Sequence, residues 1–185
     1  MLVLTKMHIR GYQHNVKVID DAHVPYVVLY RDFRDVCISQ YHYVKLTPWH
    51  NFHKRAVRMT LSDYIDFFQK GVLADFCQWV DEWDENRDKS RSILVRYEDL
   101  LEDPHGSLRR ILNLYELPAT DEQVNEMVEK NSFSRLSGGR DRGQEVKSSF
   151  FRKGKAGDWK NHFTQKQADG FREVAGEWFD RHGYG

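Results

Sequence analysis

The sequence has no long apolar run and little cysteine. No stretch approaches the roughly 20 apolar residues that a membrane-spanning helix needs, so we expect no membrane association. The cysteines are two, Cys37 and Cys77, too few for a disulfide framework and without the spacing of a metal site. Charged and imidazole side chains also interrupt the region where a signal peptide would have its apolar core: Lys6, His8, Arg10, His14 and Lys17. We therefore expect a cytoplasmic protein without a metal.

An excess of charge of either sign is also missing. Lys and Arg together number 28, and Asp and Glu together number 28. No overall field therefore attracts nucleic acid or an anionic membrane, and any recognition of an anion must come from local clusters. A length of 185 residues with 40% hydrophobic side chains predicts a single domain, residues 1–185, with a core of its own.

The apolar pattern predicts strands that alternate with helices. Short strands are expected over residues 2–4, 24–30 and 92–97. Helices are expected over 34–44, from 60 through 68, over 73–86 and 104–115, from 120 through 128, and from 164 to Gly183. This order predicts an α/β domain with a parallel sheet flanked by helices. Residues 45–58 and the basic, glycine- and serine-rich residues 131–160 are expected to be loops, and loops as long as the second are usually functional or disordered.

The turn after the predicted strand 24–30 is the first candidate site. Arg31 stands at the carboxyl end of that strand, where α/β sheets bind ligands, and Ser39 lies about two turns into the following helix. An arginine fork and a hydroxyl beside a helix start suit a phosphate. Alternatively, Arg31 pairs with Asp32 or Asp35 at the helix cap, and the geometry alone does not decide between the two interpretations.

The second candidate is Arg152-Lys153-Gly154. Consecutive basic side chains followed by glycine let charges and backbone N–H groups converge on one anion, although a solvated basic loop has the same composition. A nucleotide P-loop is excluded here, because Gly138 and Gly143 are followed by Gln144 and Glu145 where Lys and Ser or Thr are required.

Three segments in order resemble the cytosolic-type sulfotransferases that use 3′-phosphoadenosine 5′-phosphosulfate (PAPS). They are YRDFRDVCISQY at 30–41, VRYEDLLEDP at 95–104 and FRKGKAGDWKNHFT at 151–164. The resemblance implies a P-loop-kinase-like parallel sheet, N-terminally truncated in this chain. It also implies PAPS as the cofactor, with 3′-phosphoadenosine 5′-phosphate (PAP) as product and no metal.

The same resemblance implies roles for individual residues. Those that would hold the 3′-phosphate are Arg31, Ser39, Arg152, Lys153 and Gly154, and those near the adenine are Tyr97 and Phe133. The family usually has threonine where this chain has Asn131, two residues before Phe133. Without the resemblance, both aromatic residues would be read as core residues.

Lys6-Met7-His8 is similar to the family's Lys-Thr-His at the end of a strand. By this match His8 is the general base that takes the proton of an acceptor hydroxyl, a task suited to imidazole because its pKa lies near neutrality. Lys6 would support charge near the transferred group. The acceptor, a small molecule or a carbohydrate, is expected in a pocket formed by the variable segments 45–58 and 138–149.

The family's other phosphate loop, a Pro-Lys-Ser-Gly-Thr-like turn after the first strand, is absent from the sequence. That loop binds the 5′-phosphosulfate in the family, and losing such a group commonly costs about 10²–10³ in rate. We therefore expect a sulfotransferase or a truncated form of one, with a dimer or other self-association to cover the missing strand. The dimer motif itself is altered at Gln165 and Asp169.

Two alternatives remain open. One is a PAP- or PAPS-binding remnant without catalysis. The other is a protein that binds single-stranded nucleic acid through the aromatic and basic side chains of its loops, with Trp49, His50, His53, Phe150 and Phe151 as the candidates. The balanced charge argues against nucleic acid as a partner.

Overall fold

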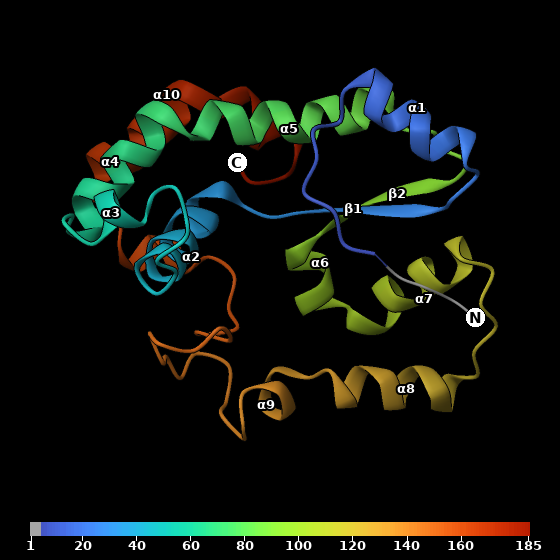
Figure 1. Ribbon diagram of the computed structural model, residues 1–185. Coiled ribbons are helices and arrows are strands. Elements are labelled where there is room, and N and C mark those ends of the chain that lie inside the picture. The colour runs from blue at the N-terminus through green and yellow to red at the C-terminus, as the bar shows by residue number, and fades with distance from the viewer. Residues whose placement is uncertain (1–4) are drawn as a thin grey trace.

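The sheet of the computed structural model, which describes residues 5–185, consists of two parallel strands (Figure 1). β1 (Tyr26–Tyr30) pairs with β2 (Ser92–Arg96), with Tyr26 opposite Ser92 and Tyr30 opposite Arg96. The α/β fold with a parallel sheet is therefore confirmed. The strand predicted over residues 2–4 lies outside the described residues.

Helices cover both sides of the sheet in Figure 1. On one side α4 (Leu61–Gly71), α5 (Leu73–Asn86) and α10 (Gln165–Arg181) pack against one another. α1 (Gln13–Asp21) packs against α5. The other side carries α6 (Tyr97–Glu102), α7 (Pro104–Leu114) and α8 (Asp121–Lys130). None of the described helices is both long and apolar enough to cross a membrane.

α2 (Phe33–Lys45) follows β1 directly and connects the sheet to the large aromatic core. In that core the Phe68 and Phe171 rings stack in parallel planes with their centroids 6.0 Å apart, which joins α4 to α10. Phe33, at the first position of α2, packs its ring at 4.6 Å from Trp178 of α10. These contacts hold the start of α2, and with it the turn at Arg31, against a rigid layer of helices.

Side-chain caps begin most of the helices that the sequence predicts. Reciprocal capping boxes start α4, α8 and α10, formed by Thr60 with Asp63, Thr120 with Gln123 and Thr164 with Gln167. α7 has Pro104 in its first turn, and the Asp103 carboxylate accepts a hydrogen bond from the Gly106 N–H at 2.9 Å. The predicted starts of these helices are confirmed.

The structure differs from the sequence-based expectation at several other elements. α1 was not expected, and its N-cap residue Tyr12 makes no side-chain cap. The predicted strand end at Tyr97 was wrong, because Tyr97 is the first residue of α6. The two predicted loops also contain short helical turns, namely α3 (His53–Ala56), α9 (Phe133–Leu136) and η1 (Asp158–Asn161).

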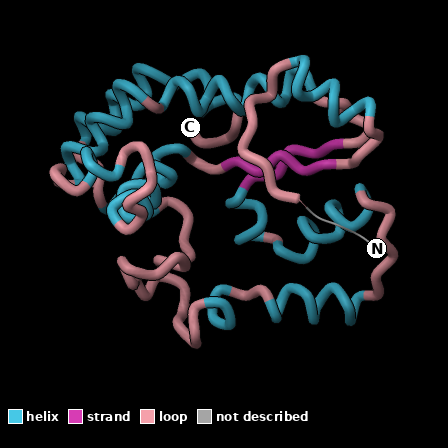
Figure 2. The backbone as a smooth tube through the Cα atoms, viewed as in Figure 1, coloured by secondary structure: helices cyan, strands magenta, loops and turns pink. Residues whose placement is uncertain are grey.

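Residues 137–157, which we call the basic loop, join α9 to η1. Figure 2 shows this stretch as a run without helix or strand that leads from α9 back toward α2. Arg140 organises the loop, because its guanidinium donates hydrogen bonds to the carbonyl oxygens of Gln144, Phe151 and Arg152 at 2.9, 2.6 and 3.1 Å. The loop is therefore folded on itself and ends beside the start of α2.

Candidate functional site

Arg31 lies at the carboxyl end of β1, immediately before the cap of α2. The cap is Asp32, whose carboxylate accepts a hydrogen bond from the Arg34 N–H at 2.9 Å. Arg31 Nη2 contacts the Asp35 carboxylate at 3.2 Å and the Lys155 carbonyl oxygen at 2.9 Å. Its guanidinium carbon lies 4.5 Å from the centre of the Tyr97 ring. Of the two interpretations left open by the sequence, the ion pair with Asp35 is present, and it leaves other faces of the guanidinium available.

Arg31 Nε is buried and has no hydrogen-bond partner within residues 5–185. The Glu98 carboxylate is 3.9 Å away, within ion-pair range but beyond hydrogen-bond distance. A buried N–H donor without a partner is costly in a folded protein. Arg31 therefore has an unused donor at the end of β1.

Asp35 brings the end of the basic loop to this turn. Its carboxylate, which is fully buried, accepts hydrogen bonds from the Gly157 N–H at 2.6 Å and the Trp159 N–H at 2.9 Å. These contacts join positions more than 120 residues apart in the sequence. They place the Arg152-Lys153-Gly154 segment close to Arg31.

Asp158 is the counter-charge of that segment. Its carboxylate contacts Arg152 Nη2 at 3.0 Å and Lys153 Nζ at 2.5 Å. Burial alone would raise the pKa of the Asp158 carboxyl, but hydrogen bonds from Lys153, Asn161 and Arg152 outweigh it and hold the pKa well below its ordinary value. Arg152 also pairs with Glu145 of the basic loop. Both cations are thus oriented by carboxylates of the same segment.

Gly154 packs against the Phe133 ring. Its φ of +65° lies in the left-handed region, and a Cβ atom at this position would lie only 2.3 Å from the ring carbon Cδ2. Phe133 is the first residue of α9, and the Ser132 hydroxyl caps that turn by accepting from the Arg135 N–H. Only glycine leaves room for this aromatic ring to lie flush with the basic loop.

These residues share one cavity of about 670 Å³, which we call the basic cavity. All seven residues that the resemblance assigns to nucleotide binding line it, namely Arg31, Ser39, Tyr97, Phe133, Arg152, Lys153 and Gly154. Leucines of α6 and α7 form part of its wall. The cavity therefore combines cations with apolar and aromatic surface, the composition that an aromatic ligand with anionic groups requires.

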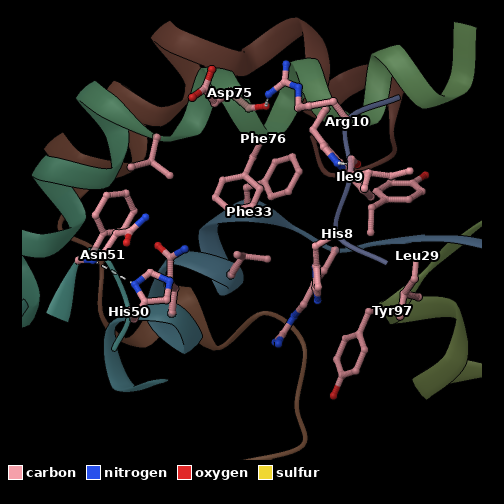
Figure 3. Close-up of a pocket in the computed structure, with 17 residues that line it drawn as sticks. His8, Ile9, Arg10, Leu29, Phe33, His50, Asn51, Asp75, Phe76 and Tyr97 are labelled. Atoms are coloured by element: carbon pink, nitrogen blue, oxygen red, sulfur yellow. Dashed lines mark hydrogen bonds between the residues drawn. The ribbon is translucent and has the colours of Figure 1, made fainter. Parts of the chain in front are cut away.

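A second cavity of about 670 Å³ adjoins the first, and we call it the aromatic cavity. Arg31 and Tyr97 line both cavities. Figure 3 shows His8 and Tyr97 on one side of the aromatic cavity and His50 and Asn51 on the other, with Phe33 and Phe76 between them.

His8 is exposed, and so is Lys6, which lines neither cavity. The predicted pocket contribution of residues 45–58 corresponds to His50, Asn51 and Phe52.

Sequence reasoning missed most of the contacts made by the carboxylates that hold the cations. Asp35 was considered only as a possible partner of Arg31 at the helix cap, and Asp158 and Glu145 were assigned no role. The pattern of charged residues along the sequence does not indicate that the Asp35 carboxylate accepts hydrogen bonds from backbone N–H groups at the start of η1. The matched segment 151–164 contains Asp158, but the resemblance implied no role for it.

Comparison with known proteins gives consistent matches. The family model described as the sulfotransferase domain matches residues 2–183. Sulfotransferase 6B1 of Danio rerio is 29% identical over 154 residues, which cover 80% of this chain and 49% of the relative. Human sulfotransferase 1C2 is 28% identical over 156 residues, which cover 78% of this chain and 51% of the relative. The chain thus spans about half the length of these curated relatives.

Solved structures share the fold. Mouse sulfotransferase SULT7A1 complexed with PAP superposes with a TM-score of 0.70 at 22% identity, over 88% of this chain and 60% of that one. Retinol dehydratase in complex with androsterone and the inactive cofactor PAP gives a TM-score of 0.70 at 24% identity, over 87% of this chain and 49% of that one.

Proposed function

The chain belongs to the sulfotransferase domain family, and from this premise we propose that it binds the 3′-phosphoadenosine part of PAPS in the basic cavity. One observation carries the proposal: the seven residues implied by the resemblance come from four separate segments and line a single cavity. The solved relatives SULT7A1 and retinol dehydratase are complexes with PAP, which supports the same ligand.

The cavity offers matching chemistry for each part of that nucleotide. Arg31 and Arg152, which both line the cavity, supply planar guanidinium forks suited to a phosphate dianion. Lys153 and Ser39 add a further charge and a hydroxyl. Tyr97 and Phe133 offer ring surface to the adenine. Gly154 keeps the loop close enough to the Phe133 ring for these groups to converge.

We propose further that the aromatic cavity binds a hydroxyl compound and that the chain transfers a sulfuryl group to it. The hydroxyl oxygen attacks sulfur, so that a new oxygen–sulfur bond forms while the bond from sulfur to the phosphate oxygen breaks and PAP leaves. His8 takes the hydroxyl proton. Its position on the side of the aromatic cavity near Tyr97, which also lines the basic cavity, supports this role (Figure 3).

A second candidate function, binding of PAP or PAPS without transfer, is favoured by one observation. Lys6, the cation expected near the transferred group, is exposed and lines neither cavity. A transfer assay with labelled PAPS and a simple phenol separates the candidates. If the chain catalyses transfer, the purified chain turns over. The rate is then expected to fall by about 10²–10⁴-fold in His8→Gln, with unchanged affinity for PAP. PAP binding without any turnover leaves the second candidate.

A further inference from the structure

Gln40 presents a fixed hydrogen-bond donor to the aromatic cavity. The side chain lines the cavity from α2. Its carbonyl oxygen Oε1 accepts a hydrogen bond at 2.8 Å from the hydroxyl of Tyr64, whose side chain is completely buried. This contact fixes the orientation of the amide and uses its oxygen, so the Nε2 group is left to bind a ligand. Within residues 5–185 it donates to no other group, and it is not enclosed by protein. Gln40 therefore offers N–H groups to a ligand.

His50 presents a second donor for a related reason. Its Nδ1 accepts a hydrogen bond from the Phe52 backbone N–H at 3.1 Å. A ring nitrogen that accepts carries no proton, so the proton of the neutral imidazole is on Nε2. The ring is held between Tyr43 and Phe52, with centroid distances of 5.9 and 5.5 Å. The backbone N–H of His50 donates a hydrogen bond to the Thr47 carbonyl oxygen at 3.0 Å, which fixes the backbone that carries the ring.

Most of the other residues that line the aromatic cavity beside Gln40 and His50 are apolar or already bonded. Phe33, Val36, Phe52 and Phe76 contribute hydrocarbon surface. Trp79 also lines the cavity, but its Nε1–H donates to the Ile9 carbonyl oxygen at 2.6 Å. Among the described residues that line this cavity, the neutral side-chain donors with an orientation fixed by a hydrogen bond and no partner of their own are thus those of Gln40 and His50. Asn51 also lines the cavity, but no hydrogen bond orients its amide.

We infer that the acceptor substrate carries a neutral oxygen with free lone pairs, such as a ketone, at the end remote from its reacting hydroxyl. Gln40 Nε2 and His50 Nε2 bind that oxygen. Figure 3 places His50 across the cavity from His8, so the two polar ends of such a molecule lie at opposite ends of an aromatic-lined space. An ammonium group is disfavoured at the Gln40 end, because fixed N–H donors face it. The inference rests on the proposed function and deepens it by naming the substrate class.

A pair of matched phenols tests the inference. One carries a ketone on a chain of two methylenes para to the hydroxyl, and the other has C=CH₂ in place of the C=O. The methylenes isolate the phenol from the change, so its acidity stays the same. Binding to the PAP complex is measured by calorimetry. Since a hydrogen bond contributes about 0.5–1.5 kcal/mol, the ketone is expected to bind roughly tenfold more tightly to the wild-type chain.

Two substitutions each remove one donor and keep its internal contact. In Gln40→Glu a carboxylate oxygen still accepts from Tyr64, and in His50→Asn the amide oxygen replaces Nδ1 as acceptor for the Phe52 N–H. Each is expected to reduce the ketone preference to about threefold, and the double variant is expected to abolish it. Gln78→Glu, the same change at an exposed position of α5, is expected to keep the full preference.

Equal binding of the two phenols to the wild type, or no binding of either, overturns the inference. So does a preference that survives in the double variant but disappears in Asn51→Ala. The affinity for PAP alone is measured in the same samples. Failure of PAP to bind contradicts the proposed function, whereas normal PAP binding without a ketone preference contradicts only the present inference.

Discussion

The Gly157 backbone N–H donates a hydrogen bond to the Asp35 carboxylate at 2.6 Å. This contact joins the end of the basic loop to the first turn of α2, and the Trp159 N–H adds a second bond to the same carboxylate at 2.9 Å. Arg31 Nη2 contacts Asp35 Oδ2, the oxygen that also accepts from Gly157, at 3.2 Å. One buried carboxylate therefore holds together the two halves of the basic cavity.

Asp35→Asn is expected to lower the free energy of unfolding by about 2–4 kcal/mol. The amide can accept one N–H but carries no charge to pair with Arg31, and breaking a buried ionic network is strongly destabilising. Urea denaturation measures the change. Asp21→Asn, which removes an exposed ion pair with Lys17, is the control and is expected to cost less than about 0.5 kcal/mol. Equal effects of the two substitutions would show that Asp35 does not organise the site.

Gly154→Ala is expected to impair the site beyond the cost of backbone strain. Gly139 is the matched control, because it also has a positive φ, +94°, but open space where a Cβ would lie. Both alanines pay for the left-handed backbone, about 1–2 kcal/mol. Only the Gly154 variant also displaces the Phe133 ring. We expect PAP affinity to fall more than about tenfold in Gly154→Ala, by loss of more than 1.4 kcal/mol, and to remain near wild type in Gly139→Ala. A similar fall in both variants would contradict the assigned contact.

Glu145→Gln is expected to strengthen PAP binding by about threefold to tenfold. Glu145 pairs with Arg152, so its carboxylate competes with a phosphate for that guanidinium and repels the dianion. The amide keeps the size and polarity of the side chain, and a gain of about 1 kcal/mol is the scale of one such interaction. Calorimetry measures it, with Glu129→Gln on the exposed surface as the control. Weaker binding in Glu145→Gln would mean that the orientation that Glu145 gives Arg152 matters more for binding than its competition with the phosphate.

His42 is expected to report on the charge of the basic cavity. Burial, and then the nearby positive charge of Arg152, lower the pKa of His42 from its ordinary 6.5 to about 4. The unfolded chain therefore binds more protons between these values, and His42 stabilises the fold less as the pH falls from about 6.5 toward 4. In urea denaturation across this window, His42→Gln should lose less stability than the wild type.

The same histidine gives a ligand-dependent signal. A bound phosphate offsets the charge of Arg152, so PAP is expected to raise the pKa of His42, while 5′-AMP is expected to raise it less. Imidazole resonances followed by NMR against pH measure both shifts. An unchanged pKa in the presence of saturating PAP would place the phosphate away from Arg152.

Three helices were predictable from the sequence because a local capping signal begins each of them. Thr60, Thr120 and Thr164 each precede a partner three residues on, and that spacing specifies a helix start by itself. α1 was missed because its cap position, Tyr12, supplies no such bond. Its placement depends on tertiary packing, in which Val16 lies in one buried cluster with Val28 and Trp83. α6 was missed because Tyr97 extends the strand-like stretch 92–96 and the residue before it, Arg96, makes no side-chain cap.

The candidate site was predictable in its residues but not in its architecture. Resemblance identified Arg31 and Arg152, and the structure places both on one cavity. Local patterns could not show that Asp35 would bind the backbone of Gly157, because this contact joins segments 122 residues apart. For the same reason the donor of Gln40, which depends on Tyr64 of another helix, has no signature in the sequence.

Calorimetric titration with PAP and with 5′-AMP tests the central claim most directly, because the two ligands differ only in the 3′-phosphate. The account predicts that the wild-type chain binds PAP at least roughly tenfold more tightly, the equivalent of about 1.4 kcal/mol. It predicts that Arg31→Ala and Arg152→Ala each abolish this difference. Equal affinity of the wild-type chain for the two nucleotides, or no binding of either, would contradict it.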